Sequence, residues 1–208
     1  PTFAKEITAA NIYRKYLPSP EVNLLRLNVQ GNYLGLYVNT EAVDKQFLKK
    51  QFDEKDGVLI KCDPIQVFCG NNTANGNPDL KWLGADSANY YNSYDVKSDH
   101  GWGELMELIE KIHFDFENLG EILNIDRVLW AFAVNSAILN LDTYNGYYVH
   151  NYYLYRTEDG LFQMIPWDFD NSFAGAILGW DYFDPMAVYN YDTYGNQYAP
   201  NERPLLEK

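Results

Sequence analysis

Three polar side chains in the second half of the sequence have the types and the order that metal-assisted chemistry requires. Asp142 comes first, Asn151 follows it by nine residues, and Asp168 lies further along, in the segment IPWDFDNSF. Hard divalent cations bind carboxylate and amide oxygens, and Mg²⁺ usually takes one or two carboxylates together with substrate phosphates. Asn151 and Asp168 could supply such oxygens. An aspartate held off the metal, Asp142, could accept a proton from an attacking hydroxyl.

The pattern around these residues predicts an antiparallel hairpin that brings them together. The dipeptide Asp159-Gly160 favours a two-residue turn, because both positions tolerate positive φ. In the register that this turn sets, Asn151 lies directly opposite Asp168, with the two Cβ atoms about 5 Å apart. A shift of one residue would break the match. The open end of the hairpin should therefore hold an amide and a carboxylate side by side.

The elements that position these residues follow from apolar periodicity. Residues 124–141, NIDRVLWAFAVNSAILNL, are apolar on most sides and predict a buried helix that delivers Asp142 to the hairpin. Alternating residues and the turn dipeptide Gly31-Asn32 predict another hairpin over residues 22–40. Other segments predict helices over 3–17, 41–52 and 101–112 and a strand over 57–63.

Composition predicts a globular chain and argues against two classes of partner. Of the 208 residues, 47% are hydrophobic and 22% are charged, which is the balance of a folded domain. The formal net charge of -13 argues against nucleic acid, because phosphate backbones require clustered Lys and Arg. The longest apolar run, within 128–141, is interrupted by Asn135 and Ser136. It is shorter than the roughly 20 apolar residues of a membrane span, so we expect no membrane span in this chain.

Cys62 and Cys69 lie close together in the sequence. In an exported protein such a pair indicates a disulfide, and two free thiols are the equally weighted alternative. Two cysteines alone do not make a zinc site, and the 3 histidines are too scattered to complete one. Asn71-Asn72-Thr73 is a glycosylation sequon within a segment that predicts an irregular loop.

Several motifs in combination resemble one known family. They are VQGNYLGLYVNTEAVDKQFL and GVLIK in the first part of the chain, then HNYYLY and IPWDFDNSF. With these motifs the chain is similar to the CotH family of spore-coat-type atypical protein kinases, and the resemblance runs through most of the sequence. It implies an α+β, protein-kinase-like fold, with a truncated N-lobe hairpin and a mainly helical C-lobe. It also implies ATP with Mg²⁺ or Mn²⁺ as cofactors, a protein substrate phosphorylated on Ser/Thr hydroxyls, and an extracellular, cell-surface or spore-coat location.

The resemblance implies roles for individual residues as well. Asp142 corresponds to the catalytic aspartate of the family and Asp168 to its metal-binding aspartate. Asn151 and Asp170 correspond to supporting metal positions. Glu41 follows the strand that resembles the one leading to the kinase hinge, which would bring it near the adenine or ribose of the nucleotide.

The sequence departs from the common kinase pattern in three respects. The asparagine lies further from the catalytic aspartate than in the usual catalytic loop, and Phe169-Asp170 stands where a Phe-Gly pair is usual. The glycine-rich segment and phosphate-contacting lysine of the family would lie upstream of Pro1. We therefore expect residues 1–208 to be a fragment of one kinase-like domain, lacking that segment and the C-terminal end, and inactive alone.

Two other functions are compatible with the sequence. One is a pseudokinase or structural assembly module that keeps the fold without transferring phosphate. The other is a carbohydrate-active or sugar-binding protein, which the 16% aromatic content favours. The i, i+2 spacing of Asp168 and Asp170 disfavours it, since two carboxylates must flank a glycosidic bond. Without the resemblance, these aspartates and Asp142 would be interpreted as caps or turn residues, and His150 as a structural hydrogen-bonding residue.

Overall fold

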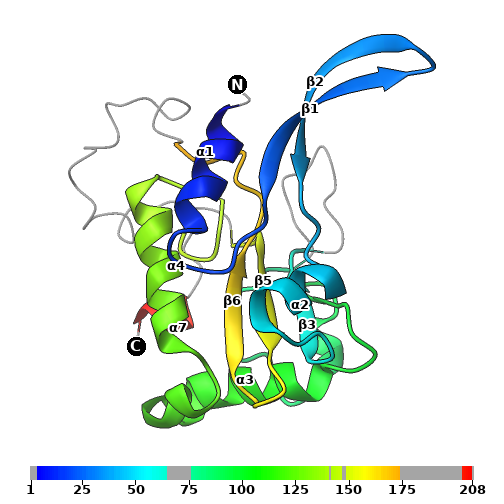
Figure 1. Ribbon diagram of the computed structural model, residues 1–208. Helices are drawn as coiled ribbons and strands as arrows, with labels where there is room; N and C mark the ends of the chain where they lie inside the picture. The colour runs from blue at the N-terminus through cyan, green and yellow to red at the C-terminus, as the bar shows by residue number, and fades with distance from the viewer. Residues whose placement is uncertain (1–3, 65–75, 141, 147–148, 174–202, 208) are drawn as a thin grey trace.

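Two antiparallel sheets, with helices packed beside them, make up the described part of this computed structural model, residues 4–64, 76–140, 142–146, 149–173 and 203–207 (Figure 1). The architecture is mixed α+β, as the sequence predicts. In chain order the elements are α1 (Ala4–Tyr13), β1 (Val22–Val29), β2 (Asn32–Thr40), α2 (Lys45–Phe52), β3 (Val58–Cys62), the 3-10 helix η1 (Ser87–Tyr90), β4 (Asp95–Val96), α3 (Trp102–Phe114), the 3-10 helix η2 (Phe116–Glu121), α4 (Ile125–Ala137), β5 (Tyr152–Arg156), β6 (Phe162–Pro166) and α7 (Pro204–Glu207).

The larger sheet has the strand order β4-β3-β5-β6 and contains the predicted hairpin as β5 and β6. Both strands of this hairpin are buried almost throughout. Tyr153 and Ile165 pack on one side against Phe47 of α2, whereas Leu154 and Phe162 belong to the main core with α3 and α4. The expectation of a mainly helical second lobe therefore left out a four-stranded sheet. That sheet forms because β3 pairs along the whole of β5.

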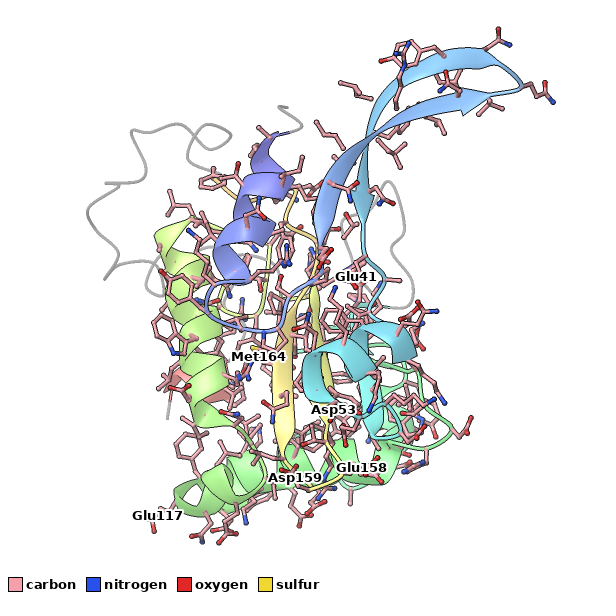
Figure 2. The ribbon with its side chains drawn as sticks, in the orientation of Figure 1. Glu41, Asp53, Glu117, Glu158, Asp159 and Met164 are labelled. Carbon is pink, nitrogen blue, oxygen red and sulfur yellow. The ribbon has the colours of Figure 1, made fainter. Side chains whose placement is uncertain are left out.

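The register of the β5–β6 hairpin differs by one residue from the sequence prediction. Tyr152 pairs with Pro166, and the backbone N–H of Trp167 donates to the carbonyl of Asn151 at 3.1 Å. The cause is a three-residue loop, Glu158–Gly160, in place of the predicted two-residue turn, with Gly160 at φ 90°. A glycine in the left-handed region also closes three-residue hairpin loops. Figure 2 labels Glu158 and Asp159 at this closed end of the hairpin.

Helix α4 is covered on one side only, so the prediction of a buried helix holds for part of its surface. Leu129 and Trp130 are 60% and 40% exposed, while Val134 and Asn135 are buried. Helix α1 lies beside α4, and Tyr16, just beyond its end, stacks on Trp130 at a ring-centroid distance of 4.7 Å (Figure 1). A polar asparagine is buried on α4 because α1 supplies it with a hydrogen-bond partner.

The β1–β2 hairpin, predicted over residues 22–40, projects away from the larger sheet (Figure 1). In the described part of the chain no third strand joins it. Leu24, Tyr33 and Leu36 are 43%, 51% and 46% exposed, which contrasts with the buried strands of the β5–β6 hairpin.

Some expectations fall on parts of the sequence that the structure does not describe. Cys62 is fully buried in β3, but Cys69 and the sequon at residues 71–73 lie outside the described residues, and so does most of the tyrosine-rich stretch after residue 173. Within the described ranges, no helix combines the length and the apolar character that crossing a membrane requires.

Candidate functional site

The open end of the β5–β6 hairpin brings together the three residues that the sequence singled out. Asn151 directly precedes β5, Asp168 comes just after β6, and Asp142 lies in the loop that follows α4. The backbone φ angles of Asn151 and Asp168 are 59° and 53°. These values lie in the left-handed region, which Asn and Asp tolerate better than most residues. Both residues have therefore left the extended conformation of the strands that they flank.

Asp142 is held by donors from both sides of the hairpin. Nε2 of His150 lies 3.0 Å from Oδ1 of Asp142. The side-chain amides of Asn151 and Asn171 donate to Oδ2 of Asp142, at 3.2 Å and 2.9 Å. Its own backbone N–H donates to the side-chain oxygen of Asn140 at 3.4 Å. Since only 16% of the Asp142 side chain is exposed, its orientation is set by the protein and not by solvent.

His150 supplies positive charge beside Asp142. Burial alone would lower the pKa of His150, but the hydrogen bond to Asp142 and the charges of Asp142, Asp63 and Asp168 outweigh burial and raise it. The imidazolium form is thereby favoured next to the carboxylate. The interpretation of His150 as a hydrogen-bonding residue is confirmed, and its partner is the candidate catalytic aspartate.

Asp168 lies in the opposite kind of electrostatic environment. Burial and the nearby carboxylate of Asp170 raise the pKa of Asp168 to about 6, and Glu6 of α1 adds to the effect. The backbone N–H of Asp170 donates to Oδ1 of Asp168 at 3.4 Å. Neither carboxylate forms an ion pair with a basic side chain among the residues that the structure describes. Among the described residues this pair of acids therefore has no salt bridge, and the positive group that its charge reaches is His150, through Asp168.

The oxygen atoms that flank this end of the hairpin are of the types that a divalent cation binds. Asp168 and Asp170 offer carboxylate oxygens, and the amide oxygen of Asn151 accepts no hydrogen bond from the described residues. In the same part of the chain, no three His, Cys, Asp or Glu side chains are arranged as a complete metal site. A cation bound by so few protein oxygens would be of the Mg²⁺ type, which keeps waters and substrate phosphates as further ligands.

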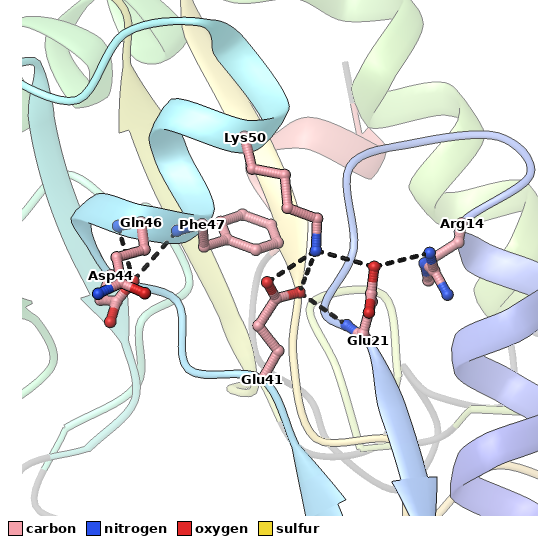
Figure 3. A network of polar contacts seen from close by, with 7 residues as sticks. All are labelled: Arg14, Glu21, Glu41, Asp44, Gln46, Phe47 and Lys50. Atoms are coloured by element: carbon pink, nitrogen blue, oxygen red, sulfur yellow. Dashed lines mark hydrogen bonds and ion pairs between the residues drawn. The ribbon is translucent and has the colours of Figure 1, made fainter.

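Glu41 lies in a separate ionic network at the base of the β1–β2 hairpin (Figure 3). Nζ of Lys50 is 2.8 Å from Oε1 of Glu41 and 2.9 Å from Oε1 of Glu21, which also pairs with Arg14 at 3.1 Å. The backbone N–H of Glu21 donates to Oε2 of Glu41 at 3.0 Å. The carboxylate of Glu41 is thus already engaged, and a nucleotide hydroxyl would have to share it with Lys50.

Two residues that contribute to the site were not identified from the sequence. Asn171 directly follows Asp170, and its proximity to that acid was the one signal that could have identified it. Tyr13 has no such signal, because the residue that its hydroxyl contacts, Asn135, is 122 positions away. Its ring stacks on Phe169, between the two acids, at 4.7 Å.

Comparisons with known proteins identify the family of this chain. The sequence matches the profile of the family described as "CotH kinase protein" over residues 3–208. A curated relative, "Inner spore coat protein H" of Bacillus subtilis (strain 168), is 26% identical over 168 residues. That alignment covers 77% of this chain and 43% of the relative, so the chain matches less than half of the relative's length. Since the family profile spans nearly the entire sequence, the chain belongs to the CotH kinase family.

Proposed function

We propose that this chain forms the catalytic part of an atypical protein kinase that transfers the γ-phosphate of ATP to Ser/Thr hydroxyls of a protein substrate. The observation that carries the proposal is the contrast between Asp142 and the neighbouring pair of Asp168 and Asp170. Asp142 is oriented by three donors, and one of them is His150, whose raised pKa favours its positively charged form. Asp168 and Asp170 have no salt bridge among the described residues. Phosphoryl transfer uses both kinds of carboxylate, one as proton acceptor and one for the metal.

Asp142 is proposed to orient the substrate hydroxyl and to accept its proton as the bond to phosphorus forms. Its carboxylate has both oxygens engaged, by His150 on Oδ1 and by two amides on Oδ2. Donors on both oxygens fix the direction in which the carboxylate points. Asp142 is therefore proposed to position the hydroxyl as well as to accept its proton, and its removal should cost a factor within the roughly 10²–10⁴ range typical of general bases.

Asp168, Asn151 and Asp170 are proposed to hold Mg²⁺ or Mn²⁺. Such a cation, when bound, would neutralise phosphate charge and orient the γ-phosphate. Asp168 is proposed as the principal ligand of the cation, because its carboxylate has the raised pKa that an added cation would reverse. Asn151 links the two acids, since its amide nitrogen donates to Asp142 while its oxygen is available for the metal.

The rest of the chain is proposed to form kinase-like lobes around this site. The β1–β2 hairpin would belong to the first lobe, with α1 as its regulatory helix, and the sheet with α3 and α4 to the second. Glu41, at the base of the first hairpin, would face the nucleotide while Lys50 holds it. By analogy with the spore coat relative, the protein would act outside the cell, at the cell surface or in the spore coat.

The test uses the full-length protein with radiolabelled ATP, Mg²⁺ or Mn²⁺, and a protein acceptor. Wild type should transfer phosphate to Ser or Thr. Asp168→Asn, which removes the charge at the metal and keeps the shape, should lose more activity than Asp142→Asn, which should fall about 10²–10⁴-fold. Glu158→Gln is the matched control, since it removes one negative charge at the closed end of the same hairpin (Figure 2), and it should retain wild-type activity.

Three outcomes would contradict the proposal. Transfer by Asp168→Asn at the wild-type rate would remove Asp168 from the metal site. Nucleotide binding by wild type without any transfer would assign the protein to the pseudokinases instead. A sugar array with tight binding and no nucleotide binding would favour the carbohydrate function.

A further inference from the structure

The side chain of Tyr13 on α1 connects the two segments that carry the acids of the site. It is fully buried. Its hydroxyl donates to the side-chain oxygen of Asn135 on α4 and accepts from Nδ2 of Asn140 at 3.0 Å. Its ring stacks on Phe169 with an interplanar angle of 26°. One residue of α1 thus contacts the start of the Asp142 loop through its polar end and the Asp168 segment through its apolar face.

The polar contacts of Tyr13 continue to the Asp142 loop through two asparagines. The side-chain oxygen of Asn140 accepts the backbone N–H of Asp142 at 3.4 Å. The amide of Asn135 donates to Asn145 further along the same loop, at 2.6 Å, and the backbone carbonyl of Asn135 accepts from the N–H of Asn140 at 2.8 Å. The loop is consequently held at Asp142 and Asn145 by the two asparagines that meet at the Tyr13 hydroxyl.

The apolar contact reaches the second acid segment. Phe169 is fully buried and lies between Asp168 and Asp170, so its ring position sets the backbone from which both carboxylates extend. The backbone N–H of Ser172 donates to the carbonyl of Phe169 at 3.1 Å, and that of Phe173 to the carbonyl of Ile138 at 2.7 Å. These bonds anchor the segment after the acids to the end of α4.

We propose that Tyr13 is a positioning residue, which fixes the Asp142 loop and the Asp168 segment relative to each other and makes the position of α1 a determinant of the phosphoryl-transfer rate. The expected effect on the phosphoryl-transfer rate rests on the proposed function. The coupling between the Asp142 loop and the Asp168 segment can be measured without that function. Any movement of α1 must break a buried hydrogen bond or the ring stack, because the same side chain makes both contacts.

The hydroxyl is the part of Tyr13 whose role can be isolated. Burial raises the pKa of Tyr13, so the hydroxyl stays protonated and keeps its donor. Phenylalanine would preserve the stack on Phe169 and remove one hydrogen bond from each of Asn135 and Asn140. Buried polar groups that lose a hydrogen bond rearrange or admit water, and both responses would loosen the loop.

The experiment compares Tyr13→Phe with Tyr16→Phe in the full-length protein. Tyr16 is the matched control, because it lies one turn further along, is half-exposed and stacks on Trp130 instead of Phe169. Two kinds of measurement are made. The first is steady-state kinetics, which gives kcat and KM for ATP, and the second is hydrogen exchange of the backbone amides of 142–146 and 168–173. Asn140→Ala serves as a second variant in case Tyr13→Phe does not fold, since it interrupts the connection at the loop.

Tyr13→Phe should lower kcat roughly 10- to 100-fold, as small misplacements of reacting groups do. The KM for ATP should change less than about twofold, since the contacts of Tyr13 are with the loop and Phe169. Exchange of the loop amides should accelerate at least about tenfold, as local opening becomes easier. Tyr16→Phe should change neither the kinetic constants nor the exchange rates.

Wild-type exchange in Tyr13→Phe, or in Asn140→Ala if that variant is the one that folds, would overturn the coupling. Faster exchange with an unchanged kcat would overturn the positioning role. If wild type itself transfers no phosphate, the proposed function fails, and the exchange data alone decide whether Tyr13 couples the two segments.

Discussion

The open ends of the two hairpins both carry carboxylates, but they differ in how the charge is compensated. At the base of β1–β2, Glu21 and Glu41 share Lys50, and the hydrogen bond from Lys50 lowers the pKa of Glu21. At the base of β5–β6, Asp168 and Asp170 have no basic partner among the described residues, and the pKa of Asp168 rises to about 6. Acids that stabilise a fold are paired with basic groups, whereas acids with unfavourable, unpaired charge are typical of functional sites.

The strands of the two hairpins differ in the reverse sense. Those of β5–β6 are packed on both faces, and those of β1–β2 are exposed on both. The hairpin with compensated acids therefore has few core contacts, and the hairpin with uncompensated acids is among the most buried parts of the molecule.

The largest expected effect is on the free energy of unfolding, and it distinguishes the strands of the two hairpins. Leu154→Ala in β5, where the side chain is fully buried, should lower the free energy of unfolding by about 2–5 kcal/mol, through lost burial and the cavity left behind. Leu36→Ala in β2, with 46% of the residue exposed, should cost less than about 1 kcal/mol. Urea unfolding of the two variants measures both values. Equal losses would mean that the β1–β2 hairpin is covered in solution.

A smaller effect concerns metal binding at the uncompensated acids. Below the Asp168 pKa of about 6 a proton competes with the cation, so Mn²⁺ affinity should fall roughly tenfold per pH unit. Above that pKa, Asp168 is ionised and the affinity should level off. Calorimetric titration with Mn²⁺ from about pH 5 to about pH 8 tests this dependence, because the proton concentration changes by about three decades over that range. The Asp168→Asn variant should bind weakly with little dependence on pH, and a steep dependence in that variant would assign the titration elsewhere.

The smallest effect is expected at the compensated acids. Lys50→Met removes the cation shared by Glu21 and Glu41, and since Lys50 is 41% exposed the loss in unfolding free energy should be about 0.2–1 kcal/mol. Lys49→Met, which breaks the exposed contacts of Lys49 with the carboxylate and the backbone carbonyl of Asp53, is the matched control. Thermal unfolding at low and high salt compares them. A loss above about 2 kcal/mol for Lys50 alone would show a buried network.

The comparison also shows what could be predicted from the sequence. Both hairpins and the helices α1, α2, α3 and α4 were predicted, because alternation and 3.6-residue periodicity are local signals. The proximity of Asp142 and Asn151 followed from the element order and is confirmed at 3.2 Å. The register was wrong by one residue, because Asp159-Gly160 is compatible with both a two-residue and a three-residue loop.

Other features depend on contacts between distant segments and could not be predicted. Composition indicated that α4 is apolar, but only the packing of α1 decides which of its residues are covered, so Leu129 remained exposed. The hydroxyl of Tyr13 reaches Asn135 across 122 positions, and no local pattern marks such a pair. The same holds for Lys50, whose bonds to Glu21 and Glu41 depend on the fold of the hairpin base.

The left-handed backbone at Asn151 and Asp168 has a consequence for how related sequences should be compared. Two selective pressures act at each position, one on the chemistry and one on the backbone, since β-branched or bulky residues are strained there. A descendant that lost catalysis would still be expected to keep Asn, Asp or Gly at these two positions. Asp170 and Asp142 have no such backbone constraint, so they should be replaced first, and their presence is the better record of an active ancestor.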